Sequence, residues 1–437
     1  MSAGAHTLIA TINGNQVGNL RDEANIWSFE YAPEWTISPA AFDLAPNLPR
    51  KGGKIIDGGT TRPVQWFFDN LLPEESARAV LAKEAQIQST DAFGLLAHYG
   101  KESAGAITLL APGEPLGESG YLALTDAELH ERISKLPHQS LAAGAPKRMS
   151  NAGAQHKLAV AMCDGQLFYP KGDTPSTHIL KPDHSDSDSW PHSVANEYFV
   201  MQLAGRLGLR VPPVAIRFVP DPIYLVERFD RRVSADETHR LHIIDACQLL
   251  GIDRSFKYTA ASVENLGRCV ESCNRPARAR LDVLAWVLFN LLTGNGDAHL
   301  KNLSFRVGAE GIELAPFYDL LSTECHRTSL GIFPRWPETE LTTRIGAAGR
   351  FRDVTAEDFH TFAAQLGVNR RTASRLLADF TKRIQPAADA LYAEFEQLHG
   401  PQGIVREGQL KTLRRIRLII IHDMAQRLRD RASETLA

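Results

Sequence analysis

The segment that most constrains the fold is a polar loop that directly follows an apolar helix. Residues 281–292 are apolar except for Asp282 and Asn290, and Gly294 follows them. This stretch is too short to cross a bilayer, so it predicts a helix buried in a protein core. The loop after it carries Asp297 and Asn302, five residues apart. We therefore expect a buried core helix, followed at its C-terminal end by a loop that carries an acid and an amide.

A second acid lies downstream, at a distance that a pair of strands would close. Asp319 lies 17 residues after Asn302, and the residues between them predict strands at 303–306 and 311–314. A hairpin there would return Asp319 to the side of Asn302. In a kinase catalytic loop one carboxylate accepts the proton of the substrate hydroxyl, while an amide oxygen and a second carboxylate hold Mg²⁺. The spacing of Asp297 and Asn302 is that of such a loop.

The chain upstream of the apolar helix predicts a small β-rich lobe with one helix. The predicted strands cover 158–163, 166–169, 177–180, 214–219 and 223–226. A loop of small residues at 150–155 precedes the first strand, and small side chains let backbone N–H groups approach phosphate oxygens. The last strand leads into Glu227, Arg228 and Phe229, where the hinge of a kinase offers backbone groups to adenine.

A lysine and an acid in this lobe form a candidate ion pair. Lys181 ends the third strand, and Glu197 lies on the apolar face of the helix that follows. An acid on an apolar face needs a cationic partner. Lys181 and Arg228 are both candidates, and the sequence leaves the choice open.

The fold expected from this order of elements is α+β. The chain has 437 residues, too many for a single hydrophobic core. We predict a protein-kinase-like two-lobed fold with an N-terminal β-rich subdomain and a mainly helical large lobe. The expected boundaries are 1–111 for the N-terminal subdomain, 112–148 for a linker and helical connection, 149–230 for the small lobe and 231–437 for the large lobe.

Charge and cysteine content narrow the function classes. The net charge of −3 disfavours a globally basic nucleic-acid binder. The N-terminus shows no secretory signal pattern. The five cysteines are an odd number, and the pair Cys269 and Cys273 alone is a weak zinc signal. Free thiols in a reducing cytoplasm, without a membrane partner, are the expectation.

Together these motifs resemble those of the HipA family of bacterial kinases. The N-terminal subdomain resembles that family's N-terminal domain in the segments 31–35, 67–73 and 105–106. The motifs occur in the family's order over nearly the whole chain. The kinase part carries the resemblance in the segments 150–157, 178–181, 196–198, 226–231, 296–302 and 317–319.

The resemblance implies roles for individual residues. It implies that Asp297 is the catalytic base, that Asn302 and Asp319 bind Mg²⁺, that Glu197 supports Lys181 and that Ser150 is autophosphorylated. His156 departs from the acidic residue common in the family's loop, and His299 could instead orient the catalytic loop. The implied ATP-site residues are Ala152, Gly153, Ala154, Gln155, His156, Lys157, Lys181, Glu227, Arg228, Phe229, His299, Leu300, Lys301, Asn302, Tyr318 and Asp319.

The resemblance also implies a biological role. The family's members are toxins of toxin–antitoxin pairs, and some phosphorylate glutamate–tRNA ligase and arrest growth. The implied cofactors are ATP and Mg²⁺. The implied partners are a small helix-turn-helix antitoxin like HipB, a translation-related protein substrate, and operator DNA reached only through the antitoxin.

Two other functions remain open from the sequence. Residues 362–380 read as a helix-turn-helix, which in a DNA-binding regulator would present Arg370, Arg371 and Arg375. Burial of Val368, Ala373, Leu376 and Leu377 in the large lobe would argue against that interpretation. A small-molecule kinase of similar architecture would use the same base and metal, and only its acceptor would differ.

Overall fold

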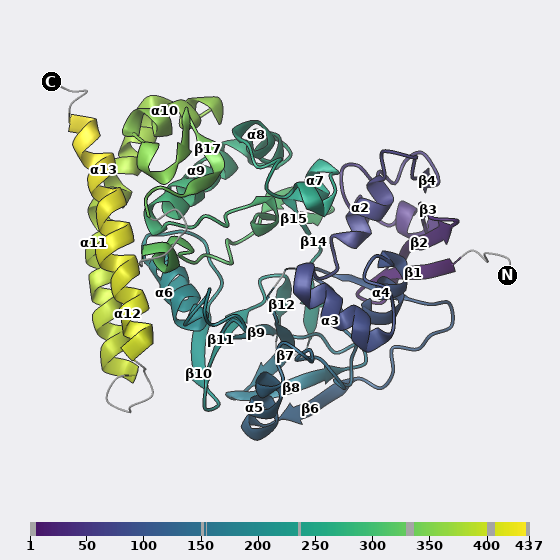
Figure 1. Cartoon of the computed structure of the whole chain (residues 1–437). Coiled ribbons are helices and arrows are strands. Elements are labelled where there is room, and N and C mark those ends of the chain that lie inside the picture. The colour runs from purple at the N-terminus through teal and green to yellow at the C-terminus, as the bar shows by residue number, and fades with distance from the viewer. Residues whose placement is uncertain are drawn as a thin grey trace.

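The computed structural model describes residues 6–149, 153, 155–234, 237–328, 336–399 and 407–433. Figure 1 shows the N-terminal unit at the right, the small lobe below and the large lobe at the upper left. The predicted class is confirmed. Helices and sheets are mixed, and the chain forms two lobes and, in addition, an N-terminal β-rich unit. No described helix has both the length and the apolar character needed to cross a membrane.

The N-terminal unit is a five-stranded antiparallel sheet in the order β4-β3-β2-β1-β5. The hairpin at its start forms because Asn13 and Gly14 both take positive φ, 47° and 79°. The elements are β1 (His6–Ile12), β2 (Asn15–Glu23), β3 (Ile26–Tyr31), β4 (Ile55–Ile56), β5 (Ile107–Leu110), α1 (Pro33–Ile37), α2 (Pro63–Asp69), α3 (Glu75–Ala85) and α4 (Ala92–Tyr99).

The small lobe is a six-stranded sheet in the order β10-β11-β9-β7-β8-β6. All five strands predicted for it are present. The edge strand β6, at the end of the sheet opposite β10, comes from the segment 112–148 that was expected as a linker and helical connection. It pairs antiparallel with β8. The elements are β6 (Gly120–Leu124), β7 (Leu158–Cys163), β8 (Gln166–Lys171), β9 (His178–Pro182), β10 (Val214–Phe218), β11 (Pro222–Glu227), α5 (Asp126–Ser134) and α6 (Ser193–Arg206).

The large lobe is mainly helical, but it holds more strands than we predicted. The hairpin expected after the catalytic loop is β15 (Ser304–Gly308) and β16 (Gly311–Leu314), and β14 (Ile243–Asp245) extends it to three strands. Four further short strands pair as two hairpins: β12 (Arg231–Val233), β13 (Thr238–Arg240), β17 (Glu340–Ile345) and β18 (Ala348–Arg350). The prediction of a mainly helical large lobe over 231–437 therefore left out β12, β13, β14, β17 and β18.

The helices of the large lobe surround α9, the predicted apolar core helix. Six further helices and a π-helical segment make up the rest of the described helical part of this lobe, and short 3₁₀ turns join several of them. The bounds are α7 (Ala246–Leu250), α8 (Val263–Glu271), α9 (Pro276–Thr293), α10 (Ala356–Gln365), α11 (Arg370–His399), α12 (Glu407–Arg415), the π-helical Ile416–Ile421 and α13 (His422–Ser433), with 3₁₀ turns at Arg254–Phe256, Leu300–Asn302, Glu324–Thr328 and Phe351–Asp353.

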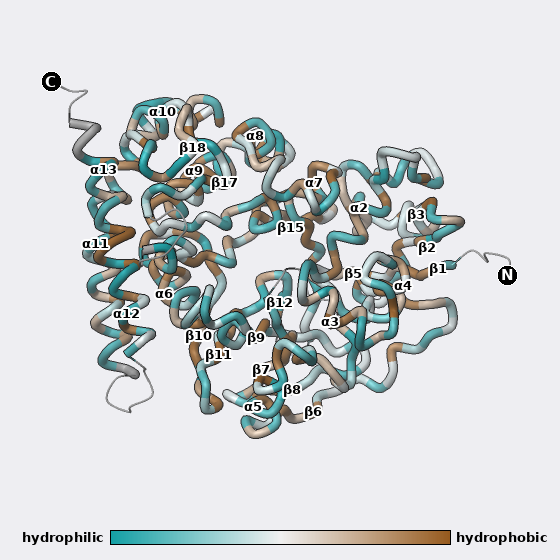
Figure 2. Tube along the Cα trace, in the orientation of Figure 1, coloured by the Kyte–Doolittle hydropathy of each residue, from teal (hydrophilic) through white to brown (hydrophobic). Residues whose placement is uncertain are grey.

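The segment that read as a helix-turn-helix is part of this core. Val368, Ala373 and Leu377 are buried, at 6%, 0% and 4% exposure, where α10 and α11 meet the rest of the lobe, and Leu376 is half-buried against the same core. Figure 2 shows hydrophilic and hydrophobic residues interleaved along the helices at the left, α11 to α13, as expected for helices with one buried face. The packing gives residues 362–380 a structural role and removes the support for an independent DNA-binding unit.

A buried charge cluster joins the N-terminal unit to the kinase lobes. The Glu102 carboxylate, 0% exposed, lies 2.5 Å from the Lys147 ammonium and 2.8 Å from the Arg231 guanidinium. Arg228 lies 3.5 Å away, and the Ser176 hydroxyl donates to Glu102 at 2.6 Å. Burial alone would raise the pKa of Glu102, but these cations outweigh burial and hold that pKa well below its usual range.

Glu102→Gln is expected to lower the free energy of unfolding by about 3–5 kcal/mol, because it leaves buried cations without their shared anion. Denaturant unfolding at pH 7, followed by circular dichroism, measures this loss. Glu30→Gln is the matched control, since Glu30 pairs with Arg21 at a side-chain exposure of 48% and should cost no more than about 1 kcal/mol. The stabilisation by Glu102 is present above pH 4.5 and is lost as the pH falls through its lowered pKa. Equal losses in the two variants would contradict this account of the junction.

Candidate active site

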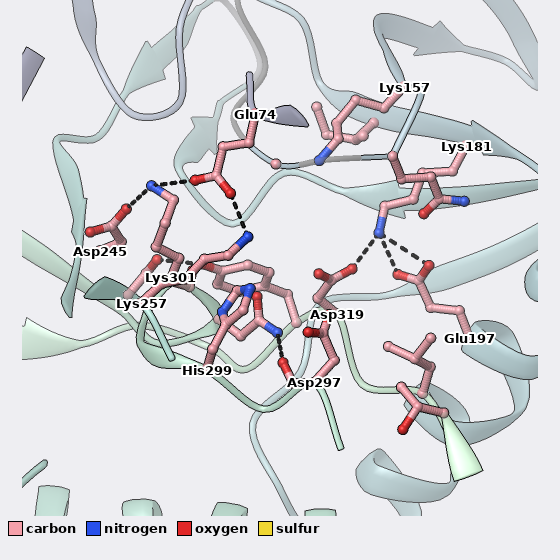
Figure 3. A pocket seen from close by; sticks show the side chains of 18 of the residues that line it. Glu74, Lys157, Lys181, Glu197, Asp245, Lys257, Asp297, His299, Lys301 and Asp319 are labelled. Atoms are coloured by element: carbon pink, nitrogen blue, oxygen red, sulfur yellow. Dashed lines mark hydrogen bonds and ion pairs between the residues drawn. The ribbon is translucent and has the colours of Figure 1, made fainter. Parts of the chain in front are cut away.

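A cleft of about 1060 Å³ lies where the three parts of the molecule meet (Figure 3). The N-terminal unit contributes Glu74 to its lining, the small lobe contributes Lys157 and Lys181, and the large lobe contributes Asp297 and Asp319. Residues far apart in the sequence thus converge on one enclosed space. Convergence of several buried charged groups on a large cleft is typical of a catalytic site.

Lys181 sits between two carboxylates at the centre of the cleft. Its ammonium lies 2.8 Å and 3.1 Å from the two carboxylate oxygens of Glu197 and 2.6 Å from Asp319. The sequence left the partner of Glu197 open between Lys181 and Arg228. The partner is Lys181, and Arg228 pairs with Asp230 at 2.6 Å instead. β9 carries the lysine, and the buried face of α6 carries the glutamate.

Opposite charges in this group stabilise the charged forms of Lys181 and Asp319. Burial disfavours the Lys181 ammonium, but Asp319 and Glu197 outweigh burial and raise its pKa. Burial also disfavours the Asp319 carboxylate, but Lys181 and Lys157 lower its pKa to about 2. Burial lowers the pKa of Lys157 to about 8, with the charge of Lys181 acting in the same direction. Lys181 and Asp319 are therefore both charged at neutral pH.

The C-terminal end of α9 shapes the catalytic loop. Gly294 ends the helix with a φ of 63°, the left-handed conformation that glycine adopts without strain. The Asn295 amide then donates to the Asn290 side chain at 2.9 Å, and its oxygen accepts from the Asp297 backbone N–H at 3.0 Å. The asparagine in the apolar stretch thus anchors the loop that carries Asp297.

Asp297 and Asn302 lie next to each other in this loop. The Asn302 amide nitrogen donates to the Asp297 backbone carbonyl at 2.8 Å, and the Tyr258 hydroxyl donates to the Asp297 carboxylate at 2.6 Å. Burial raises the pKa of Asp297, with His299 opposing it. A raised pKa makes the carboxylate a better proton acceptor when it is ionised.

The hinge end of the cleft carries two aromatic rings. Phe229 and Tyr318 face each other with ring centroids 5.4 Å apart. The Tyr318 hydroxyl donates to the Lys301 backbone carbonyl at 2.6 Å, which fixes its position. The Glu227 side chain is exposed, as expected for a hinge residue that contributes backbone groups. These rings give the cleft a flat apolar end suited to a heteroaromatic base.

The remaining predicted residues fall into three groups. Gly153, Gln155 and Lys157 line the cleft, whereas Ser150, Ala152 and Ala154 lie outside the described residues. The side chains of His156 and Leu300 are buried away from the lining. Lys301 lines the cleft, but its ammonium is directed to Asp245 at 2.5 Å and to the Asn70 side chain at 2.7 Å.

Several residues that line the cleft were not predicted from the sequence, and three of them bear on the catalytic loop. Glu74, Lys257 and Tyr258 line it, and Tyr258 contacts Asp297 directly. Glu74 follows the segment 67–73 that resembles the HipA N-terminal domain, which was the available signal. Nothing in the local sequence marks Lys257 or Tyr258, since their partners are remote in the chain.

The site suits Mg²⁺ by the chemistry of its donors. The Asn302 amide gives its nitrogen to the Asp297 carbonyl, which leaves the oxygen end turned the other way. That oxygen and the Asp319 carboxylate are hard ligands of the kind Mg²⁺ binds, and Mg²⁺ takes its remaining ligands from water and phosphates. The His299 Nδ1 atom is buried with no hydrogen-bond partner among the described residues, an open polar position beside these ligands.

Two family domains and several known proteins match this chain. The HipA N-terminal domain matches residues 8–110, and the HipA-like C-terminal domain matches residues 149–388. The chain is 33% identical over 408 residues to Y4mE of Sinorhizobium fredii, a protein named as a kinase, which covers 89% of this chain and 94% of that protein. It is also 33% identical over 403 residues to the serine/threonine-protein kinase toxin HipA of Shewanella oneidensis, covering 87% and 88%.

A solved structure agrees with the sequence relatives. The Shewanella oneidensis HipA, determined in a complex with HipB and operator DNA, superposes with a TM-score of 0.80 at 27% identity. The superposition covers 98% of this chain and 99% of that chain. The chain belongs to the HipA family of serine/threonine-protein kinases.

Proposed function

We propose that the chain transfers the γ-phosphoryl group of Mg²⁺-bound ATP to serine or threonine hydroxyls of proteins. The observation that carries this proposal is the convergence of Lys181, Glu197 and Asp319 on one cleft with Asp297. Glu197 holds the Lys181 ammonium, which is the charge available to the ATP phosphates. Phe229 and Tyr318 bound the end of the cleft that suits adenine.

The step proposed for Asp297 is proton transfer during substitution at phosphorus. The acceptor hydroxyl oxygen forms a bond to the γ-phosphorus, its proton passes to the Asp297 carboxylate, and the bond from the γ-phosphorus to the β–γ bridging oxygen breaks to release ADP. Mg²⁺ held by Asn302 and Asp319 would offset the phosphate charge. Tyr258 orients the Asp297 carboxylate through its hydrogen bond. Catalysis then rests on positioning and electrostatics.

The biological part of the proposal follows the relatives. We propose a cytoplasmic toxin, neutralised by a small helix-turn-helix antitoxin like the HipB that accompanies the Shewanella oneidensis protein. The proposed substrate is a translation-related protein, with glutamate–tRNA ligase as the first to test. Following the complex of the Shewanella oneidensis protein with HipB and operator DNA, we propose that the chain reaches operator DNA only through the antitoxin. Arg370, Arg371 and Arg375 are exposed on α11.

Incubation with Mg²⁺ and γ-labelled ATP is expected to place label in protein and, within this chain, on Ser150. Phosphorylation adds about −1.5 to −2 charges. Next to the loop of Gly153 that charge would compete with ATP phosphates for Lys157 and Lys181, so the modified form should bind ATP at least about tenfold more weakly. Mass spectrometry paired with ATP titration of both forms measures this.

The same incubation separates the alternatives. Small alcohols and sugars added as acceptors should stay unlabelled, and transfer to them in place of protein would support the small-molecule kinase. Omission of Mg²⁺ is the control and should abolish labelling. Equal ATP affinity of the phosphorylated and unmodified forms would overturn the proposal that phosphorylation of Ser150 weakens ATP binding.

A further inference from the structure

We infer that Glu74, a residue of the N-terminal unit, is a positioning residue for phosphoryl transfer that joins the phosphate loop of the small lobe to the catalytic loop of the large lobe. The inference rests on the proposed function. In the proposed function, no residue of the N-terminal unit carries out a step of the transfer. The positioning role of Glu74 would be that unit's contribution to the chemistry. Three sets of contacts support it.

The first set is made by the side chain. The Glu74 carboxylate, only 4% exposed, accepts from the Lys257 ammonium at 2.6 Å and lies 3.6 Å from the Lys301 ammonium. Figure 3 shows it between the two lysines, with Asp245 on the far side of Lys301. Burial disfavours the carboxylate, but Lys301 and Lys257 outweigh burial and lower the pKa of Glu74. The two lysines are thus held by an anion that stays charged at neutral pH.

The second set connects those lysines to the reacting groups. Lys257 precedes Tyr258, whose hydroxyl donates to the Asp297 carboxylate at 2.6 Å. The Lys257 backbone carbonyl accepts from the Leu300 N–H at 3.2 Å, inside the catalytic loop. Lys301 precedes Asn302, the proposed Mg²⁺ ligand. Glu74 therefore holds the two flanks of the group formed by Asp297 and Asn302.

The third set is made by the backbone. The Glu74 N–H donates to the Gly153 carbonyl at 3.2 Å, and Pro73 and Gly153 form a parallel bridge. Gly153 belongs to the loop proposed to contact ATP phosphates. One residue thus reaches the phosphate loop with its backbone and the catalytic loop with its side chain. This division makes the two functions separable by substitution.

Loss of the Glu74 charge should act mainly through Lys257. Lys301 would keep Asp245 at 2.5 Å and the Asn70 side chain at 2.7 Å. Lys257 would keep Glu75 at 3.4 Å, and the Glu75 side chain is 63% exposed, so that contact is screened by water. Its ammonium would also remain over the Tyr258 ring, 5.1 Å from the ring centroid. Lys257 is therefore expected to shift, and Tyr258 and the Asp297 carboxylate would shift with it.

Glu74→Gln is expected to lower kcat for phosphorylation of a protein acceptor by about 10- to 100-fold, the cost of a displacement on the order of 1 Å at the reacting group. The KM for ATP should change by less than about threefold, because the backbone contact to Gly153 is retained. Glu30→Gln is the matched control, because Glu30 is an exposed acid of the same unit that pairs with Arg21 outside the cleft lining, and this variant should keep both constants. Lys257→Met should reproduce the loss in kcat, and adding Glu74→Gln to it should cost little more.

The outcomes separate this inference from the proposed function. If the wild-type protein transfers no phosphate, the proposed function fails. If the wild type transfers and Asp297→Gln does not, while both Glu74→Gln and Lys257→Met keep the wild-type kcat, only the positioning role is overturned. A loss spread equally over kcat and the KM for ATP would also overturn it, since that pattern indicates a general disturbance of the cleft. If Glu74→Gln does not fold, the kcat of Lys257→Met alone decides.

Discussion

Asp319→Asn is expected to weaken Mg²⁺-ATP binding by roughly 10²-fold, since a metal–phosphate clamp supplies several kcal/mol. The Asp319 carboxylate has a pKa of about 2, so the substitution removes a full negative charge at any assay pH near neutrality. It also removes the 2.6 Å ion pair with Lys181. Transfer should fall further than binding, because the developing phosphate charge is offset only in the intact site.

A comparison with metal-free ATP makes this prediction specific. Without Mg²⁺, Asp319→Asn should bind ATP as tightly as the wild type or more tightly, because the Lys181 ammonium is released from one of its two carboxylates. Isothermal titration with and without Mg²⁺ measures both affinities. Equal Mg²⁺-ATP affinity in the two proteins would contradict the assignment of Asp319 as a metal ligand.

The catalytic core could be predicted from the sequence because its signals are local or ordered. The end of α9 at Gly294 and the hairpin of β15 and β16 follow from apolar periodicity and turn residues within short windows. The position of Glu197 on the apolar face of α6 required a buried partner, and the structure supplies Lys181. The order of these elements then indicated the two-lobed fold.

Contacts between distant parts of the chain could not be predicted in the same way. Glu74 and Lys257 are 183 residues apart, and nothing in the sequence around either residue encodes their 2.6 Å contact. Strand β6 was missed because its segment is short, follows a stretch rich in Gly and Pro, and pairs with a strand remote in the chain, β8. Short strands such as β12 and β13, with three residues each, likewise carry too few residues to show a period.

Asp297→Gln is expected to reduce phosphoryl transfer by about 10²- to 10⁴-fold, the usual contribution of a positioned general base. Asp297 contacts no cation of the central ion-pair group directly, and Lys181, Glu197 and Asp319 keep their contacts in the variant. ATP affinity should therefore stay within about threefold of the wild type. Expression of this variant should no longer arrest growth if toxicity depends on transfer.

A surface carboxylate provides the matched control for that substitution. Asp379 lies on α11, pairs with Arg383 at 2.7 Å and has a side-chain exposure of 49%. Asp379→Gln should keep transfer, ATP affinity and toxicity, because such exposed pairs contribute little. A loss of transfer in both variants would point to a general effect of the substitution and not to a base at position 297.

The most direct test of the central claim is single-turnover transfer from γ-labelled ATP, with ATP affinity measured on the same preparations. The account predicts label in protein for the wild type, and for Asp297→Gln a rate at least about 10²-fold lower with ATP still bound. Undiminished labelling by Asp297→Gln, with ATP bound as tightly as by the wild type, would contradict the assignment of this cleft as the site of phosphoryl transfer.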